Sequence, residues 1–179
     1  MWSDYLCPWA YLGTDRTALL VELGLTVTVL PFELHPELPA EGRAVKPGGR
    51  LAAVFDYIAS ECASAGLAFR APTHIPNSRA ALQAAELVRE HEPESFDRLH
   101  AALFAAVFVD ARDIGDVADA IHRNIAWPGV RASTDAAIAQ GVTGTPAYLL
   151  DNRLLVPGVQ PREALAQWVS RLRDRPAAG

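Results

Sequence analysis

The stretch Asp4–Gly13 constrains the fold more than any other part of the chain. Tyr5 and Leu6 can end a short buried strand. Pro8 favours the first turn of a helix, because its fixed φ suits that position and its missing N–H would have no helical partner there. Cys7 is therefore predicted to lie where a strand ends and a helix begins. The unpaired N–H groups and the dipole of a helix start lower the pKa of a thiol, so Cys7 is a candidate nucleophile. It could equally be a small buried core residue.

A second stretch, Gly141–Leu150, combines a glycine-rich loop with a short apolar strand. Asp151 and Asn152 form the predicted turn that leads into a second short strand. Pro146 opens the first of these strands, where it removes no hydrogen bond that the ladder needs. The Thr145–Pro146 peptide bond is a candidate cis bond, although cis is a minority state for bonds before proline.

These motifs resemble the DsbA-like branch of the thioredoxin superfamily: a Cys-Pro helix start, a late Gly-Val-x-Gly-x-Pro loop before a hairpin, and a long helical stretch between them. The details are most similar to FrnE-type proteins, and next to 2-hydroxychromene-2-carboxylate isomerases and kappa-class glutathione transferases. Further matches follow in the family's order. They are Phe32-Glu33-Leu34-His35-Pro36, Gly66-Leu67, Pro76-Asn77-Ser78-Arg79-Ala80, Leu103-Phe104, Asp113-Ile114 and Gly158-Val159-Gln160. None is specific alone; their order and spacing together are.

The resemblance implies an α/β thioredoxin fold with an inserted all-helical domain. Residues 1–36 and 128–179 would form the thioredoxin-like domain, and residues 37–127 the helical insertion. It also implies that Pro146 follows a cis bond and faces the Cys7 sulfur, and that the backbone of Thr145 pairs with an extended thiol substrate. An extended peptide or glutathione would then be held by strand-like hydrogen bonds.

The other elements are predicted from hydrophobic periodicity and from helix-end residues. Residues 1–6 form a first strand, which is short for the family, so the strand is stunted here or the chain starts upstream. A helix ending at Gly24, a strand at 26–30 and a loop at 31–49 are predicted next. Four helices of the insertion are predicted to begin near Arg50, Asn77, Phe96 and Asp113. The last predictions are a short helix from a Ser133-Thr134-Asp135 cap to Ala139, a helix at Pro161–Arg173, and a frayed tail at 175–179.

Composition excludes several classes of function. The chain has 179 residues and a formal net charge of −5, which argues against a nucleic-acid surface. It contains no apolar run near the roughly 20 residues that cross a membrane, and no secretory signal is recognised, so a cytoplasmic location is expected. Cys7 and Cys62 are the only cysteines, and neither they nor the histidines show the spacing of metal ligands. Cys62 lies on the apolar stripe of its helix and is predicted to be a core residue.

Ala10 is the main departure from a dithiol oxidase, because a second cysteine at that position would resolve the mixed disulfide. The first hypothesis is therefore a monothiol thiol–disulfide oxidoreductase that uses glutathione as co-substrate and has no tightly bound cofactor. The second is a glutathione-dependent isomerase or transferase, and the third is a thioredoxin-like binding module without chemistry. The expected partners are a small-molecule thiol or disulfide, or an extended peptide, with a homodimer as a further option.

Five more residues are candidates for substrate binding. Pro8 and Trp9 flank the thiol, and Trp9 can offer a stacking wall. His35 could hydrogen-bond glutathione or an aromatic substrate, or could be an ordinary loop histidine. Asn77 could reach into the cleft or cap its helix. Gln160 could bind the γ-glutamyl end of glutathione, or could be an exposed residue at a helix start.

Overall fold

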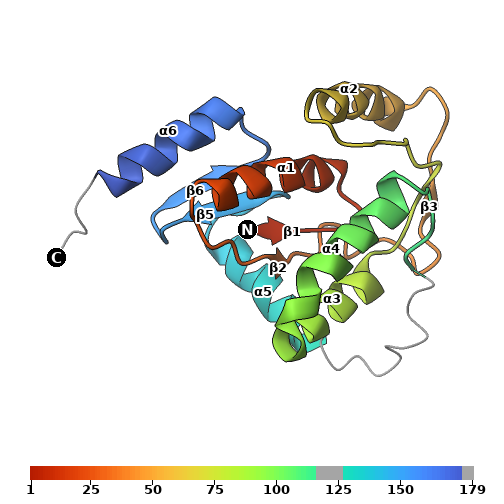
Figure 1. Cartoon of the computed structure of the whole chain (residues 1–179). Coiled ribbons are helices and arrows are strands. Elements are labelled where there is room, and N and C mark those ends of the chain that lie inside the picture. Colours follow the sequence, from red (N-terminus) through yellow and green to blue (C-terminus); the bar gives the residue numbers. More distant parts are fainter. Residues whose placement is uncertain (116–126, 175–179) are drawn as a thin grey trace.

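The computed structural model describes residues 1–115 and 127–174, and Figure 1 shows their arrangement. Six α-helices and six short strands lie in these residues. The helices are α1 (Pro8–Glu22), α2 (Arg50–Ser64), α3 (Arg79–His91), α4 (Pro93–Phe108), α5 (Trp127–Ala139) and α6 (Arg162–Arg173). The strands are β1 (Trp2–Ser3), β2 (Leu30–Pro31), β3 (Arg43–Ala44), β4 (His74–Ile75), β5 (Ala147–Leu150) and β6 (Leu154–Pro157). The fourth predicted helix after Asp113 falls mainly on residues 116–126, and the predicted tail on 175–179, both outside the described residues.

The main sheet has the strand order β2-β1-β5-β6. β1 is parallel to β2 and antiparallel to β5, and β5 is antiparallel to β6. The predicted βαβ and ββα units are therefore present, joined at the central strand β1. A second, two-stranded sheet pairs β3 with β4, and its first strand lies inside the segment predicted as a loop.

Two strands are shorter than the sequence predicts. β1 ends at Ser3 because the chain then turns, with the Cys7 N–H donating to the Asp4 carbonyl at 3.1 Å. The strand predicted at 26–30 begins only at Leu30. A run of β-branched residues favours extended chain, but a strand also requires a hydrogen-bonded neighbour. Trp2, the first residue of β1, lies opposite Leu30, so the earlier residues of the predicted strand have no residue of β1 beside them.

Helices cover both faces of the main sheet (Figure 1). Successive residues of a strand point to opposite faces, so Met1 and Tyr148 lie on one face and Trp2 and Ala147 on the other. The first face packs against α1 and α6, in a cluster that includes Leu165. The second face packs against α5. The sheet is therefore a buried central layer even though its strands are short.

The inserted helices α2, α3 and α4 share the largest hydrophobic cluster with α1. This cluster contains Cys7 and Tyr11 of the N-terminal segment together with Ile58, Cys62 and Phe104. The Tyr11 hydroxyl also donates to the carbonyl of Ala68 at 2.5 Å. The helical insertion thus packs directly on the helix that begins at Cys7.

Two predicted helix caps require correction. α5 is already helical at Trp127, so Ser133 and Thr134 do not begin it. The Ser133 hydroxyl donates to the Pro31 carbonyl at 2.7 Å, and the Thr134 hydroxyl accepts the Glu33 N–H at 3.1 Å. These side chains bind the end of β2 to α5, a tertiary role that local spacing does not reveal.

Asn77 lies one residue before the position that flanks α3, which Ser78 occupies. Its Oδ1 accepts the Arg79 N–H at 2.9 Å, so it still binds a free N–H of the helix start. Its Nδ2 donates to the Leu38 carbonyl at 2.8 Å and to that of Pro39 at 3.2 Å. Asn77 therefore ties the loop before β3 to α3.

None of the described helices is both long enough and apolar enough to cross a membrane.

Candidate active site

Cys7 lies at the position predicted for it, directly before α1. Its backbone is extended, with φ −89° and ψ 114°, and Pro8 occupies the first turn of the helix. The Cys7 carbonyl accepts the Tyr11 N–H at 3.1 Å, which starts the helical hydrogen-bond pattern. The helix begins here because Pro8 has no N–H to satisfy and a φ that already suits a helix.

The loop before β5 lies against the Cys7 sulfur. The Thr145–Pro146 peptide bond is cis. The Cys7 Sγ donates to the carbonyl oxygen of Thr145 at 3.2 Å. Residues that are 138 positions apart in the chain therefore meet at one thiol.

Gly13 and Tyr148 hold this loop close to α1, and neither was a predicted site residue. A Cβ on Gly13 would lie 3.0 Å from Pro146 Cγ and 3.0 Å from the Tyr148 hydroxyl oxygen. The Tyr148 hydroxyl donates to the Gly13 carbonyl at 2.9 Å. A glycine inside a helix, which costs helix propensity, is the sequence signal that could have pointed to this close approach.

The electrostatics of Cys7 differ from the prediction. Cys7 is only 4 % exposed, and burial raises the pKa of its thiol; the Asp4 carboxylate acts in the same direction. The Thr145 side chain and the backbone N–H groups of Ala10 and Trp9 lower the pKa, but by less. The expected lowering was therefore wrong, because a thiolate in this position loses more hydration than the helix start returns. The resting Cys7 is a protonated thiol.

Asp4 is a buried acid next to Cys7 that sequence reasoning missed. Its carboxylate accepts the Leu34 N–H at 2.7 Å and the Leu6 N–H at 3.3 Å. Burial raises the pKa of Asp4 to about 6, against the effect of its hydrogen bonds to Ser78 and to these two N–H groups. Asp4 thus joins the turn that carries Cys7 to the segment after β2.

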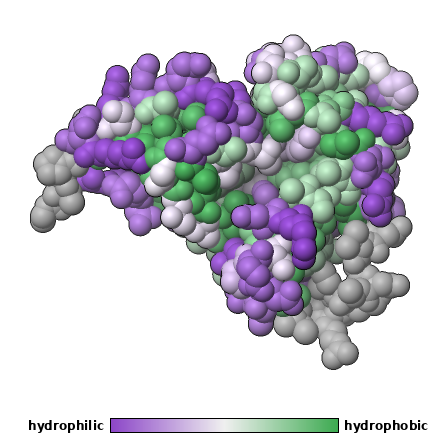
Figure 2. All heavy atoms as spheres, in the orientation of Figure 1, coloured by the Kyte–Doolittle hydropathy of each residue, from purple (hydrophilic) through white to green (hydrophobic). Residues whose placement is uncertain are grey.

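Two cavities lie next to residues that neighbour Cys7, although Cys7 itself lines neither. One of about 400 Å³ is lined by Trp9, the loop 141–147 and residues around Val159. A second, of about 350 Å³, lies between α1, α2 and the start of α6. Trp9 and Val159 line both, which places the cavities side by side. Figure 2 shows the surface hollowed between the parts of the molecule that α2 and α6 form.

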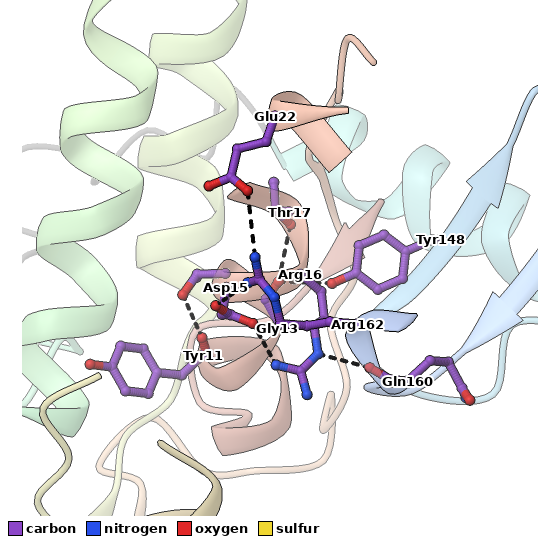
Figure 3. A network of polar contacts seen from close by, with 10 residues as sticks. Tyr11, Gly13, Asp15, Arg16, Thr17, Glu22, Tyr148, Gln160 and Arg162 are labelled. Atoms are coloured by element: carbon purple, nitrogen blue, oxygen red, sulfur yellow. Dashed lines mark hydrogen bonds and ion pairs between the residues drawn. The ribbon is translucent and has the colours of Figure 1, made fainter. Parts of the chain in front are cut away.

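A polar network fixes the wall of the second cavity (Figure 3). The Arg16 Nε donates to the Gln160 carbonyl at 2.8 Å, and its guanidinium pairs with Asp15 at 2.5 Å. Arg162 also pairs with Asp15, at 2.6 Å, and more loosely with Glu22, at 3.5 Å. Both arginines that line this cavity are therefore engaged with carboxylates of α1. The side chain of Gln160 donates to the Pro157 carbonyl at 2.6 Å.

The structure brings most of the predicted site residues together. Cys7 contacts Thr145, Trp9 lines both cavities, Pro146 lines the first cavity and Gln160 the second. Pro8 is half-buried in the first turn of α1.

His35 and Asn77 line neither of these cavities. His35 is exposed, with Nδ1 at 2.9 Å from the Glu37 carboxylate, while Asn77 is bonded as described above. Their proposed roles in binding stay predictions.

Position 10, where a dithiol enzyme carries its second cysteine, is occupied by Ala10, which is fully buried. Cys62 is a free, buried cysteine of α2, and burial raises its pKa to about 11. Among residues 1–115 and 127–174, no group of three or more side chains of the metal-ligating types is gathered closely enough to hold a metal ion.

The profile of the DSBA-like thioredoxin domain matches residues 1–127, most of the chain. The chain belongs to this family. No protein with a curated description matches it. The predicted resemblance to DsbA-like proteins is thus confirmed, whereas the finer likeness to FrnE-type proteins stays a prediction.

Solved structures confirm the fold of this DSBA-like domain. A probable DsbA oxidoreductase from Streptomyces coelicolor is 23 % identical, with a TM-score of 0.85 over 99 % of this chain and 90 % of its own. A 2-hydroxychromene-2-carboxylate isomerase is 18 % identical, with a TM-score of 0.66 over 97 % and 93 %. The cytosolic disulfide reductase DsbM from Pseudomonas aeruginosa, solved with GSH, is 19 % identical, with a TM-score of 0.62 over 96 % and 97 %. At these identities the likeness concerns the fold, and function rests on the site.

Proposed function

We propose that this DSBA-like domain is a monothiol thiol–disulfide oxidoreductase that reduces mixed disulfides with glutathione in the cytoplasm. The observation that carries the proposal is the placement of a single thiol. The Cys7 Sγ lies 3.2 Å from the Thr145 carbonyl, its neighbours Trp9 and Thr145 line open cavities, and the methyl group of Ala10 is where a resolving thiol would stand. The closeness of the Thr145 backbone to this thiol supports its role in aligning a substrate, and the thiol for the release step must come from outside.

The reaction runs in two exchanges. The Cys7 thiolate attacks the glutathionyl sulfur of a mixed disulfide; a bond from Cys7 to glutathione forms, the original S–S bond breaks, and the substrate leaves as a thiol after taking up a proton. The thiolate of a second glutathione then attacks the glutathionyl sulfur on Cys7 and forms glutathione disulfide. Cys7 returns as a thiol. The net reaction turns one mixed disulfide and one glutathione into a free thiol and glutathione disulfide.

The two cavities support glutathione as the co-substrate. An extended tripeptide attached to Cys7 would pass the backbone of Thr145, along the cavity of about 400 Å³. Strand-like pairing with backbone groups suits such a ligand. Its γ-glutamyl end would reach the cavity that Gln160 lines, where Arg16 fixes the Gln160 carbonyl.

The raised pKa of Cys7 has a kinetic consequence. The thiolate is the nucleophile, and at neutral pH the resting enzyme holds a thiol. The rate of the first exchange should therefore rise with pH until Cys7 is ionised. Binding of a substrate that donates a hydrogen bond to the sulfur would shift this ionisation toward neutral pH.

A second candidate function is a glutathione-dependent isomerase or transferase. Two observations favour it. The Cys7 thiol acts as a neutral hydrogen-bond donor to Thr145, a role that a hydroxyl can fill. The cavity of about 350 Å³ also has an aromatic wall, because Trp9 and Tyr57 lie with ring centroids 5.6 Å apart and Tyr57 is 54 % exposed. An aromatic second substrate could stack there.

Comparison of the wild type, Cys7→Ser and Cys62→Ser separates these functions. The proposal predicts that Cys7→Ser abolishes glutathione-dependent reduction of a small mixed disulfide, since a hydroxyl cannot form the intermediate. Cys62→Ser is the matched control and should keep the activity. A Cys7→Ser protein that retains or gains isomerase or transferase activity, with no reductase activity in the wild type, would establish the second function. If no variant shows activity or binds glutathione, the domain is a binding module.

A further inference from the structure

The turn that carries Cys7 has a second anchor, on a helix of the insertion. The Cys7 N–H donates to the Asp4 carbonyl at 3.1 Å, which closes a four-residue turn with Tyr5 and Leu6 at its centre. The conformation of Tyr5 therefore sets the direction in which the chain enters Cys7. The Tyr5 side chain is buried in the cluster that the insertion shares with α1.

The Tyr5 hydroxyl lies 2.9 Å from Nδ1 of His100, on α4. The ring of Tyr5 packs against the rings of His100 and Phe104, at centroid distances of 5.4 and 5.0 Å. The His100 ring in turn is stacked on Phe96, at 5.4 Å. α4 passes beside the segment between β1 and α1 (Figure 1). The contact thus joins residues 95 positions apart, and further aromatic rings hold both of its members.

The direction of this hydrogen bond follows from the surroundings of the two groups. Burial raises the pKa of Tyr5, and the carboxylates of Asp4 and Glu86 act in the same direction, so the hydroxyl keeps its proton. Burial lowers the pKa of His100 to about 4, against the effect of Asp97, so the imidazole is neutral at neutral pH. A neutral imidazole accepts through one of its nitrogens. The Tyr5 hydroxyl is therefore the donor, Nδ1 is the acceptor, and the proton of His100 is on Nε2.

We propose that Tyr5 and His100 are positioning residues, which hold the Cys7 turn against α4 and thereby keep the Cys7 sulfur at the Thr145 carbonyl. This inference rests on the proposed function, in which that placement aligns the mixed disulfide. Asp4 binds the same turn to the segment after β2, while Tyr5 binds it to α4. Because two adjacent residues are bound to different elements, the turn is held against rotation as well as displacement.

The anchor acts on two properties of Cys7. The first is its ionisation, because burial raises the pKa of the thiol. If the turn moves, the sulfur gains hydration, its pKa falls, and more thiolate is present at neutral pH. The second is alignment, because the same movement separates the sulfur from the Thr145 backbone and slows the reaction of each thiolate with a disulfide. A loosened turn thus reacts faster with a small alkylating reagent but uses its thiolate less well on an aligned substrate.

The test compares Tyr5→Phe with Tyr11→Phe. Both remove one hydroxyl from the same hydrophobic cluster, but Tyr11 lies in α1 and donates to the Ala68 carbonyl. For each folded protein, kcat/KM for reduction of a glutathione mixed disulfide is divided by the rate constant for alkylation of Cys7 by iodoacetamide, read by peptide mass at the same pH. Tyr5→Phe should lower this ratio about tenfold and raise the alkylation rate about fivefold. Tyr11→Phe should change neither.

Substitutions of His100 test the acceptor and leave the sequence of the turn intact. His100→Leu removes the acceptor and should lower the ratio as Tyr5→Phe does. His100→Asn offers an amide oxygen near the position of Nδ1 and should keep a ratio closer to that of the wild type. The double variant Tyr5→Phe/His100→Leu should lower the ratio no further than His100→Leu alone, because the two substitutions remove one bond.

An unchanged ratio in Tyr5→Phe, or equal falls in Tyr5→Phe and Tyr11→Phe, would overturn the proposal. Losses that multiply in the double variant would do the same, since the two residues would then act separately. A wild type that reduces no mixed disulfide would contradict the proposed function instead. The alkylation rates still decide the anchor in that case, because only Tyr5→Phe and His100→Leu should raise them.

Discussion

The two ends of the main sheet are built in different ways. At the Cys7 end, individual contacts fix each group: Cys7 to Thr145, Asp4 to Leu34, and the Tyr148 hydroxyl to α1. At the Met1 end, β1 contributes only two residues to the ladder, and a cavity of about 340 Å³ lies beyond it. Helices pack against both ends, and the reactive end is in addition fixed by these specific hydrogen bonds.

The comparison indicates which contacts stabilise the sheet and which contacts position the thiol. A short ladder suffices because α1 and α6 cover one face of the sheet and α5 the other (Figure 1). The Met1 end can be open because the hydrogen bonds of Cys7 to Thr145 and of Asp4 to Leu34 do not involve it. Three substitutions test this division, and the largest effect is expected first.

Leu165→Ala should be the most destabilising change at the Met1 end. Leu165 of α6 is fully buried in the cluster with Met1 and Tyr148, and truncation of such a leucine costs about 3 kcal/mol. Urea unfolding measures the loss, and Gln167→Ala on the exposed side of α6 is the control. A loss below about 1 kcal/mol would mean that α6 does not hold this end. Reductase activity of the folded variant should be unchanged.

Asp4→Asn should change the pH dependence of stability at the Cys7 end. The folded protein holds the Asp4 proton up to about pH 6, whereas the ordinary pKa is 3.8. Between these values the unfolded chain has lost the proton and the folded protein has not. The raised pKa of Asp4 therefore makes stability fall as pH rises through this window, by up to about 3 kcal/mol.

Unfolding midpoints measured across that window in the wild type and in Asp4→Asn should reveal this contribution, which the asparagine lacks. The exposed Asp110→Asn serves as the control and should follow the wild type. Parallel pH profiles for the wild type and Asp4→Asn would show that Asp4 is not perturbed as the structure implies.

Tyr148→Phe should have the smallest effect on stability. The ring of Tyr148 packs at the Met1 end, while its hydroxyl reaches the Gly13 carbonyl near the thiol. Removing the hydroxyl alone should cost about 1 kcal/mol and lower the rate at Cys7, because Gly13 sets the distance of the Pro146 loop from α1. A variant with unchanged stability and unchanged activity would show that this bond does not position the loop.

Local sequence patterns predicted the elements that local chemistry determines. Pro8 fixed the start of α1, Pro146 marked the loop before the hairpin, and the last helix was placed within a residue or two of its observed bounds. The errors concern properties that other parts of the chain decide. The β-branched run at 26–29 is not a strand because β1 begins only at Trp2, opposite Leu30, and Met1 reaches no further than the Thr28 carbonyl. The pKa of Cys7 is raised because surrounding elements bury it.

The Asp4 anchor and the Gly13–Tyr148 contact were also not predicted from the sequence. Each depends on partners 30 or more positions away. Spacing along the chain indicates which residues share a helix face or a strand face, but not which carbonyl a distant hydroxyl will reach. These contacts required the folded arrangement.

The most direct test of the central claim is the fate of Cys7 when the folded protein meets glutathione disulfide at alkaline pH. Intact mass and peptide mapping should show one glutathionyl group, attached to Cys7, which added glutathione then removes. Formation should accelerate as pH rises, because the pKa of Cys7 is raised. Cys7→Ala should take up none and Cys62→Ala should behave as the wild type. A glutathionyl group on Cys62 alone, or none on either cysteine of the folded protein, would contradict the account.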